Sequence, residues 1–429
     1  RASSIEHPAS SIQHRASSTE HRVLRAVAVG LAACGLASCG RPRAAAWEPQ
    51  EFLIALRGAP PRKADPYAQA AAAGFAVMGQ STTLDALGLA RRYGLRLMVD
   101  RIGLHPETIG RAASRRRAAE ALGRFGGHPA LWGYFVAGQV REGQLDEYAR
   151  LAAFVREHDP SRPFLVTLLP CEAWVGPALA TADYRAYLER VIAAVRPPLL
   201  VLAHHPFRAA GRSRFYFESL ELVREAAVAH GLPWCTTVRG ALWRGMPALS
   251  EGQMRWLVYT ALAYGAKGVV WFGYWGAPDG GPEGIVRPDG TPTERYRWVR
   301  ELNRELRAVG PHLLPLRSRA VYHTGTVPSG ARRLPVHGLV GSVEGGDYVV
   351  GVLEDQRGRP HLLVVNKDAE SEVVARLSVN RPCRPLWWLD PSQGEWLEAG
   401  ARVDRFHTVV EFPLPPGGGR LIRLPAASP

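Results

Sequence analysis

The sequence has almost no lysine and little cysteine, and each shortage argues against a class of protein. Lysine occurs only at Lys63, Lys267 and Lys367, so nearly all of the 53 basic residues are arginines. These arginines are scattered rather than gathered on one helix or stripe, so the formal net charge of +14 does not indicate nucleic-acid binding. The five cysteines form no CxxC pair and no Cys/His spacing typical of zinc. We therefore expect no nucleic-acid partner, no metal and no cofactor.

Long apolar runs are also lacking. The N-terminal apolar run, Ala26 to Ala37, follows the basic residues Arg22 and Arg25 and is shorter than the roughly 20 residues that span a bilayer. This pattern is typical of a secretory signal. Leu36-Ala37-Ser38-Cys39 then resembles the bacterial lipobox. The resemblance implies a lipid on Cys39 and an exported protein anchored to the bacterial cell envelope, in the periplasm or at the cell surface. An ordinary signal peptide cut nearby is the alternative.

The first 21 residues repeat in sevens, with a Ser-Ser pair at the same place in each copy. We interpret this segment as translated upstream DNA, with the true start near Val23 or Leu24, and we exclude it from the fold. Residues 1–46 are therefore assigned to a repeat tail, a lipoprotein signal peptide and a tether.

Eight short apolar runs, most of them separated by helix-sized gaps, follow the tether. They are Phe52–Leu56, Phe75–Met78, Leu95–Val99, Leu131–Val136, Phe164–Leu168, Leu199–Leu202, Trp234–Val238 and Gly268–Phe272. Apolar strands that alternate with helices are typical of a parallel sheet with both faces buried. Eight such units predict an α/β fold, a (β/α)8 TIM barrel over residues 47–317.

The intervening helices agree with this count. Ser250 and Gln253 form a predicted capping box before an apolar stripe that ends at Gly265. A helix over Tyr296–Val309 closes the barrel. From about Arg319 the period changes to two, and Tyr348–Leu353 with Leu362–Asn366 predicts a hairpin. Residues 318–429 are therefore predicted to form a C-terminal β-sandwich.

The run from His128 to Tyr134, His-Pro-Ala-Leu-Trp-Gly-Tyr, resembles the fourth strand of bacterial exported glycoside-hydrolase-like barrels. In that family H-P-A-x-x-G-Y runs into Asp-Glu-Pro, whereas this chain has Gly138-Gln139-Val140. Other segments resemble the same family: Tyr259–Gly268, Trp271–Trp275, Gly284–Val286 and Asp289–Thr293. The resemblance implies the fold of the retaining glycosidases, with catalytic groups on barrel strands four and seven.

The acids that this chemistry needs are scarce. A retaining glycosidase uses two carboxyl groups about 5 to 5.5 Å apart. Gln139 stands at the acid/base position and cannot supply a proton, and the seventh strand, Trp234–Val238, carries no acid. Asp100 and Glu172 follow strands three and five, and as catalytic candidates they would suit the wider spacing of an inverting pair. Asp100 could equally serve as a cap or as the ion-pair partner of Arg101.

Aromatic and polar residues that follow the strands are the candidates for substrate binding, because chemistry in this fold lies at the carboxyl ends of the strands. They are His204, His205, Trp174, Phe207, Arg239, Trp243, Tyr274 and Trp275. Neighbouring residues of a strand face opposite ways, so the two histidines do not ligate one metal ion. One is expected to bind a sugar hydroxyl while the other packs behind the strand. The aromatic rings suit the apolar faces of sugar rings.

The resemblance, together with these aromatic and polar residues, implies a glycoside-hydrolase-like protein that acts on or binds an oligo- or polysaccharide at the C-terminal face of the barrel. Whether it is an O-glycosyl hydrolase is left open by Gln139. The alternatives are a non-catalytic glycan-binding surface lipoprotein and a structural envelope protein.

Overall fold

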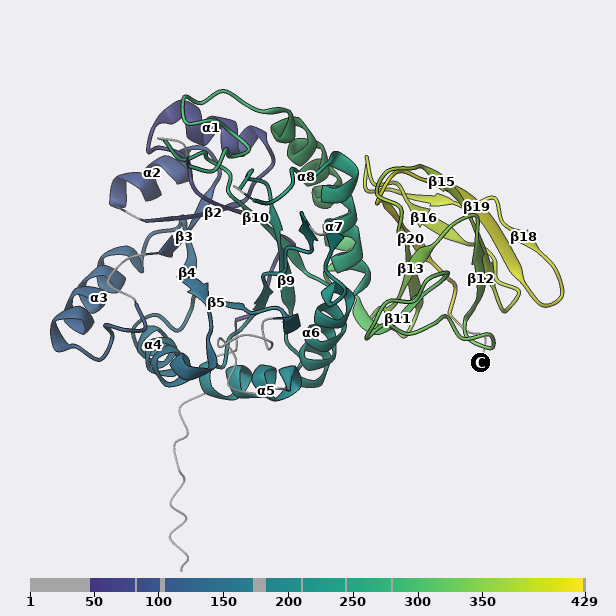
Figure 1. Cartoon of the computed structure of the whole chain (residues 1–429), viewed down its shortest axis with the longest axis horizontal. Coiled ribbons are helices and arrows are strands. Elements are labelled where there is room, and N and C mark those ends of the chain that lie inside the picture. Colours follow the sequence, from purple (N-terminus) through teal and green to yellow (C-terminus); the bar gives the residue numbers. More distant parts are fainter. Residues whose placement is uncertain are drawn as a thin grey trace, which may run out of the picture. The chain divides into compact units, whose positions relative to one another are not determined.

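Eight parallel strands close into a barrel in this computed structural model, which describes residues 47–81, 83–100, 105–172, 183–209, 211–243, 245–278 and 281–426. The neighbours around the ring run β1, β10, β9, β6, β5, β4, β3 and β2, with helices outside (Figure 1). The strands are β1 (Leu53–Arg57), β2 (Val77–Ser81), β3 (Arg96–Asp100), β4 (Leu131–Gln139), β5 (Phe164–Leu168), β6 (Leu200–Leu202), β9 (Trp234–Arg239) and β10 (Gly268–Phe272). All eight predicted strands are confirmed.

Helices follow the strands around the outside of the barrel. They are α1 (Ala64–Ala72), α2 (Leu84–Arg92), α3 (Ala112–Phe125), α4 (Leu145–His158), α5 (Tyr184–Val195), α6 (Tyr216–His230), α7 (Glu251–Ala263) and α8 (Glu294–Leu313). The predicted capping box of Ser250 and Gln253 is present at the start of α7. The closing helix α8 extends beyond the predicted range at both ends. No helix within the described ranges has the length and apolar character needed to cross a membrane.

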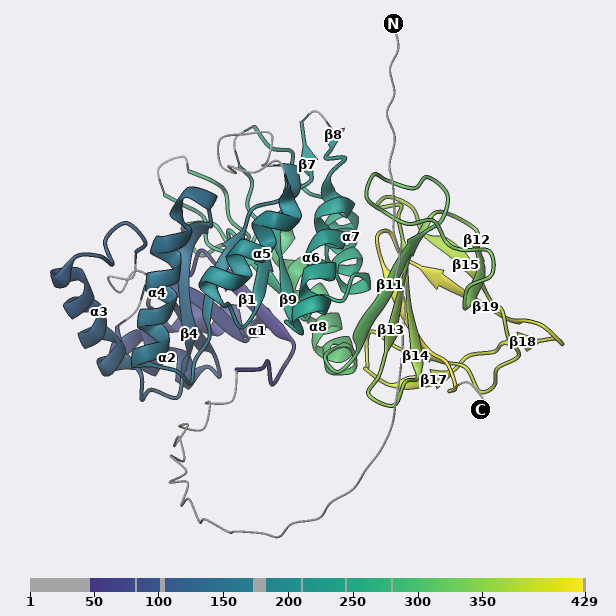
Figure 2. The ribbon, with the colours of Figure 1, turned by 90° about the horizontal axis from the view of Figure 1, so that it is seen from below.

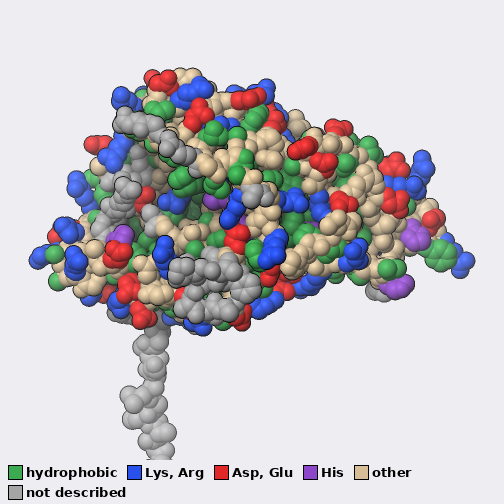
Figure 3. All heavy atoms as spheres, in the orientation of Figure 1, with side chains coloured by type: hydrophobic (Ala, Val, Ile, Leu, Met, Phe, Trp, Pro, Cys, Tyr) green, Lys and Arg blue, Asp and Glu red, His purple; other side chains and the backbone are tan. Residues whose placement is uncertain are grey.

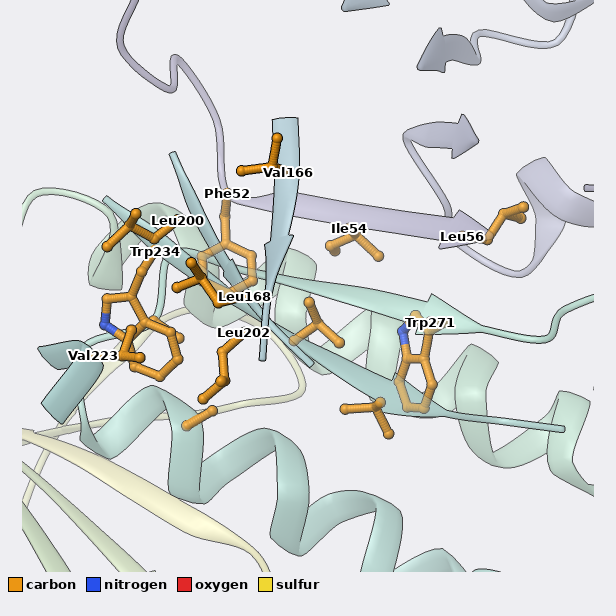
Figure 4. Close-up of a cluster of buried hydrophobic side chains, with 14 of the residues drawn as sticks. Phe52, Ile54, Leu56, Val166, Leu168, Leu200, Leu202, Val223, Trp234 and Trp271 are labelled. Atoms are coloured by element: carbon orange, nitrogen blue, oxygen red, sulfur yellow. The ribbon is translucent and has the colours of Figure 1, made fainter. Parts of the chain in front are cut away.

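Alternate residues of each strand point into the barrel, and this parity decides which side chains reach its mouth. Leu53 and Ala55 belong to the interior cluster, whereas Ile54 and Leu56 belong to the larger cluster between strands and helices. Figure 4 shows part of that larger cluster, with side chains from β1, β5, β6, β9 and β10. Along β1, β3, β9 and β10 the interior parity extends to the last residue of the strand, which is Arg57, Asp100, Arg239 and Phe272, respectively.

Two antiparallel sheets follow the barrel and enclose a second core, which confirms the β-sandwich. The predicted hairpin pairs β13 with β14, with Tyr348 opposite Asn366. One sheet contains β11 (Arg317–His323), β13 (Tyr348–Glu354), β14 (Pro360–Asn366), β20 (Gly419–Arg423), β16 (Trp387–Leu389) and β17 (Trp396–Glu398). The other contains β12 (Val340–Glu344), β15 (Val373–Val379), β19 (Thr408–Leu414) and β18 (Arg402–Val403).

The larger hydrophobic cluster continues from the barrel helices into the six-stranded sheet, because it includes Val349 and Leu363. Two polar contacts reinforce this packing. The Tyr264 hydroxyl lies 2.9 Å from Nε2 of the buried His323, and Arg332 donates to Glu221 over 2.6 Å. The sandwich therefore stabilises the side of the barrel formed by α6 and α7. These contacts do not involve the carboxyl ends of the barrel strands.

Candidate functional site

The candidate site lies where the carboxyl ends of the barrel strands meet. The β7–β8 hairpin, Phe207–Arg208 with Gly211–Arg212, projects beyond the strands at this end (Figure 2). Figure 3 looks onto the same end and shows a hollow at the centre of the ring, in which basic and histidine atoms are visible. We refer to this hollow as the barrel mouth.

Gln139 is the last residue of β4 and is fixed by its own amide. The Nε2 atom lies 3.4 Å from the Leu168 carbonyl oxygen and 3.2 Å from that of Ala203. Donation to both carbonyls requires the amide nitrogen at this place and leaves Oε1 as the remaining polar group. The pairing of β4 with β5 is irregular before Gln139, and Gly138 has φ +107°. An aspartate, which the resembled family has at this point, would be strained in that conformation.

The seventh barrel strand, β9, ends in Arg239 and carries no carboxyl group. The Arg239 side chain is buried, with Nη1 donating to the Ala241 carbonyl over 3.0 Å and Nη2 to that of Pro247 over 2.7 Å. These bonds hold the loop after β9 in place. Arg239 was predicted to bind substrate, but its Nη atoms are used by the backbone, so it acts as a support with a fixed positive charge.

Glu172 follows β5 and is surrounded by partners. It forms an ion pair with Arg208 and accepts a hydrogen bond of 2.6 Å from the Ser213 hydroxyl, while Nε2 of His204 lies 3.4 Å away without an aligned hydrogen bond. Burial alone would raise the pKa of this carboxyl, but the three partners together lower its pKa to about 2. A carboxylate held ionised and paired in this way is poorly suited to donate a proton. The geometry argues against the predicted catalytic role and favours a role in ordering the loops.

The two adjacent histidines face different environments, as their strand geometry predicted. His204 is buried, and its Nδ1 lies 3.0 Å from the Ser219 hydroxyl. His205 is half-buried, and its ring stacks on Phe272 with centroids 6.3 Å apart. Burial and the positive charge of Arg239 lower the pKa of His205 to about 4, so its imidazole is neutral at neutral pH. His205 is therefore the histidine on the mouth side.

Glu172, His204 and Ser219 stand in the order of a hydrolase triad, but their burial excludes that use. Ser219 is fully buried on α6, and its hydroxyl accepts a 3.0 Å hydrogen bond from the backbone N–H of Cys171. A nucleophile must be reachable by substrate. This network links β5, β6 and α6.

Phe272, at the end of β10, organises the mouth and was missed as a site residue in the sequence, where it counts only as the end of a core strand. The Trp243 ring stacks on it with centroids 5.5 Å apart and remains 38% exposed. Arg57 lies with its Cζ 5.5 Å from the Phe272 centroid and 4.1 Å from that of Phe135. With His205, these residues form a contiguous group that we call the Phe272 cluster. The parity of β10 is the signal that would have found it.

Other predicted binding residues are placed differently. Tyr274 is fully buried, edge-on to Phe75 at 5.2 Å, so the prediction that its ring binds substrate is wrong. Phe207 is half-buried and packs against Trp256 of α7. Trp275 is half-buried, and its backbone N–H bonds Gly58 on the loop after β1.

Three further predictions concern Asp100, Trp174 and Cys39. Asp100 ends β3 opposite Ser81 and lies on the interior parity. The geometry of the strand therefore directs Asp100 towards the mouth, and it stays a candidate acid there. Trp174 and Cys39 lie outside the described residues. Within the described ranges, no group of His, Cys, Asp and Glu is arranged to hold a metal ion.

A cavity of about 270 Å³ lies at the opposite end of the barrel. Trp47 and Trp132 line it and pack edge to face, together with Arg96 and Lys267. The amino ends of the strands surround it, and that end of this fold serves stability rather than chemistry. The cavity therefore does not belong to the candidate site.

No protein-family model and no curated protein sequence matches this chain. Solved structures do. A β-galactosidase from Bacillus circulans sp. alkalophilus aligns with a TM-score of 0.59 and 9% identity over 87% of this chain and 99% of its own. A family 5 glycoside hydrolase from Bacteroides vulgatus aligns with a TM-score of 0.56 and 10% identity over 87% of this chain and 88% of its own. A catalytic mutant of Gan42B, a GH42 β-galactosidase from G. stearothermophilus, aligns with a TM-score of 0.56 and 8% identity over 88% of this chain and 98% of its own.

The chain covers 62% of a β-galactosidase from the psychrophilic Marinomonas ef1, at a TM-score of 0.47 and 11% identity. At identities this low, structural likeness establishes the fold and leaves the chemistry to be argued from the site. The closed parallel barrel followed by antiparallel sheets is therefore a TIM barrel with a β-sandwich, a fold that the chain shares with these glycoside hydrolases.

Proposed function

We propose that this protein binds carbohydrate at the barrel mouth without ordinary retaining hydrolysis. The observation that carries the proposal is the Gln139 amide, which donates to the Leu168 and Ala203 carbonyls where the resembled family has its acid. The loss of a general acid alone costs about 10²- to 10⁴-fold in rate. The absence of a carboxyl group on β9 removes the second group that the retaining mechanism needs.

The composition of the mouth supports a saccharide ligand. Trp243 offers a ring that is stacked on Phe272 and still 38% exposed. An aromatic face held by a second ring loses little conformational entropy when a sugar packs on it. Gln139 and the neutral His205 add polar groups that can pair with hydroxyls.

A catalytic alternative depends on Asp100. It ends β3 on the interior parity, and an inverting enzyme tolerates about 6.5 to 9.5 Å between its two carboxyl groups. Glu172 is a poor second member because it is paired with Arg208 and Ser213. The glycan-binding function is therefore favoured over the hydrolase.

We also propose that the protein is exported and anchored to the cell envelope through a lipid on Cys39. Leu36-Ala37-Ser38-Cys39 supports this proposal. A surface or periplasmic glycan-binding lipoprotein would then present the barrel mouth to polysaccharide. Metabolic labelling with a fatty acid, compared between the native chain and Cys39→Ala, tests the anchor, and equal labelling of both would refute it.

The function is tested by measuring binding and turnover on one panel of polysaccharides, oligosaccharides and aryl glycosides. We expect saturable binding that Trp243→Ala weakens, with no turnover by the native protein. Turnover that disappears in Asp100→Ala would establish the hydrolase instead. The absence of both binding and turnover on the whole panel would overturn the carbohydrate proposal.

A further inference from the structure

At the ends of the described barrel strands, more positive than negative side chains lie on the interior parity. On the interior parity of the described strands, Arg57 and Arg239 end β1 and β9, whereas Asp100 ends β3. The other acid nearby, Glu172, is neutralised by its ion pair with Arg208. A site for neutral sugars in a retaining glycosidase instead presents two carboxyl groups at the same ends. The charge of this mouth is thus reversed relative to such a site.

His205 responds to that positive charge. Apart from burial, the described groups that lower its pKa are Arg239, His204 and Arg208, and no described carboxylate raises it. The Nδ1 atom of His205 and the Nε atom of Arg239 are buried and have no hydrogen-bond partner. Buried polar atoms without partners are rare in native proteins, so these two call for an explanation, and sequences depart from full pairing mainly at functional sites.

Arg57 has the placement of an arginine that recognises anions. Its guanidinium lies over Phe135 and near Phe272, so the aromatic rings hold its plane and exclude water from one face. A guanidinium in such surroundings is weakly hydrated and pairs with a carboxylate through two parallel hydrogen bonds. Hydrogen bonds to charged groups are stronger in a site of low dielectric constant than in water.

We propose that the barrel mouth binds an anionic saccharide, either a uronic acid or a sulfated sugar, with the charged group held by Arg57 beside His205 and the sugar ring against Trp243. This inference rests on the proposed carbohydrate-binding function and specifies its ligand class. An anionic ligand would explain both the positive charge of the mouth and its polar atoms without hydrogen-bond partners. Asp100 lies on the same interior parity and would face the hydroxyls of the sugar.

The experiment compares two probes with the same sugar backbone, one charged and one neutral: a galacturonic acid trisaccharide and its methyl ester. Affinities are measured calorimetrically with the purified protein at low and high salt. We expect the acid to bind at least about tenfold more tightly than the ester, which corresponds to one charge-assisted contact. The preference should decrease with salt because screening weakens it. A sulfated galactose trisaccharide, compared with the neutral one, distinguishes sulfate from carboxylate as the recognised group.

Variants of Arg57 test whether this residue recognises the charged group of the ligand. Arg57→Met keeps a long side chain against Phe135 and should lose the preference for the acid, whereas Arg57→Lys keeps part of it. Arg297→Met on α8 is the matched control, because Arg297 is 65% exposed outside the mouth. It should leave both affinities unchanged. The native protein gives a second readout by NMR: the acid should raise the pKa of His205, because a nearby anion favours the imidazolium, and the ester should not.

The outcomes separate this inference from the function on which it rests. Equal affinities for acid and ester, and likewise for the sulfated and neutral galactose trisaccharides, with no change in the His205 titration, would overturn the anionic ligand while leaving carbohydrate binding intact. A preference that persists in Arg57→Met would overturn the role of Arg57. Failure of every charged and neutral saccharide to bind would overturn both proposals.

Discussion

The two ends of the barrel differ in how completely their polar groups are paired. At the amino end, Arg162 donates to the Leu131 carbonyl, the His128 carbonyl and the Asp159 carboxylate. At the carboxyl end, buried polar atoms of Thr167, His205, Thr237, Arg239 and Tyr274 have no hydrogen-bond partner, whereas no described residue that lines the amino-end cavity has such an atom.

This difference indicates a division of labour within one fold. Unpaired buried groups reduce stability, and native proteins retain them mainly where function requires them. The amino end therefore stabilises the barrel, whereas the carboxyl end carries a cost in stability that the proposed ligand site would explain. Substitutions at the two ends should separate stability from binding.

The largest effect is expected at the amino end, from Asp159→Ala. The Asp159 carboxylate accepts 2.7 Å and 3.1 Å hydrogen bonds from the buried Tyr134 hydroxyl and from Arg162. Its removal leaves the Tyr134 hydroxyl and the Arg162 Nη1 donor without their acceptor and should lower the free energy of unfolding by about 3 to 5 kcal/mol. Urea denaturation measures the loss, and saccharide affinity at the mouth should stay unchanged below the denaturation midpoint. A loss below about 1 kcal/mol would contradict the assigned role of this end.

The next effect is expected at the carboxyl end, from Gln139→Glu. The new carboxylate would face the Leu168 and Ala203 carbonyls, so its pKa should be raised, and ionisation should cost about 1 to 3 kcal/mol of stability. A raised folded-state pKa gives stability that is present at acidic pH and lost as the pH rises through that value. The deficit relative to the native protein should therefore grow from about pH 4 to about pH 8 in thermal denaturation.

Retaining turnover should not return in this variant, because β9 still lacks a nucleophile and Gly138 keeps its φ of +107°. Gln139→Leu is the matched control, because it has no titratable group and should give a deficit independent of pH. If the stability deficit of the Glu variant is also independent of pH, its carboxyl group does not lie against the two carbonyl oxygens.

The sequence predicted the strands well because burial on both faces leaves an unmistakable apolar run. Phe164–Leu168 and Gly268–Phe272 match β5 and β10 residue for residue. The site was harder to predict, because the direction of a side chain beyond a strand depends on the loop. Tyr274 follows the last strand like a rim residue, yet its chain turns at Gly273, with φ +83°, and buries the ring. The partners of Glu172 lie more than 30 residues away in sequence, so no local sequence pattern predicts them.

A smaller effect is expected from Glu172→Gln, which tests whether this carboxylate stabilises the mouth. Its pKa is lowered to about 2. A lowered folded-state pKa gives stability that is present above the unfolded value and lost as the pH falls through the folded one. Because solvent reaches part of this region, we expect a contribution of about 1 to 2 kcal/mol. The native protein should exceed the variant in stability at neutral pH, and the two should converge between about pH 5 and pH 2. Urea denaturation across this range measures the difference, and two parallel curves would rule out the assigned ion pairing.

The smallest effect on stability, and the largest on binding, is expected from Trp243→Ala. The ring is 38% exposed and contacts Phe272 on one face, so its removal should cost about 1 kcal/mol or less of unfolding free energy. If it is the platform for the sugar, affinity should fall about tenfold, since one stacked ring contributes on the order of 1 to 2 kcal/mol to binding. Trp47→Ala at the amino end is the matched control, because Trp47 also packs on a second aromatic ring, in this case edge to face on that of Trp132. It should change stability without changing affinity. Equal loss of affinity in both variants would mean that general destabilisation, rather than contact at the mouth, explains the effect.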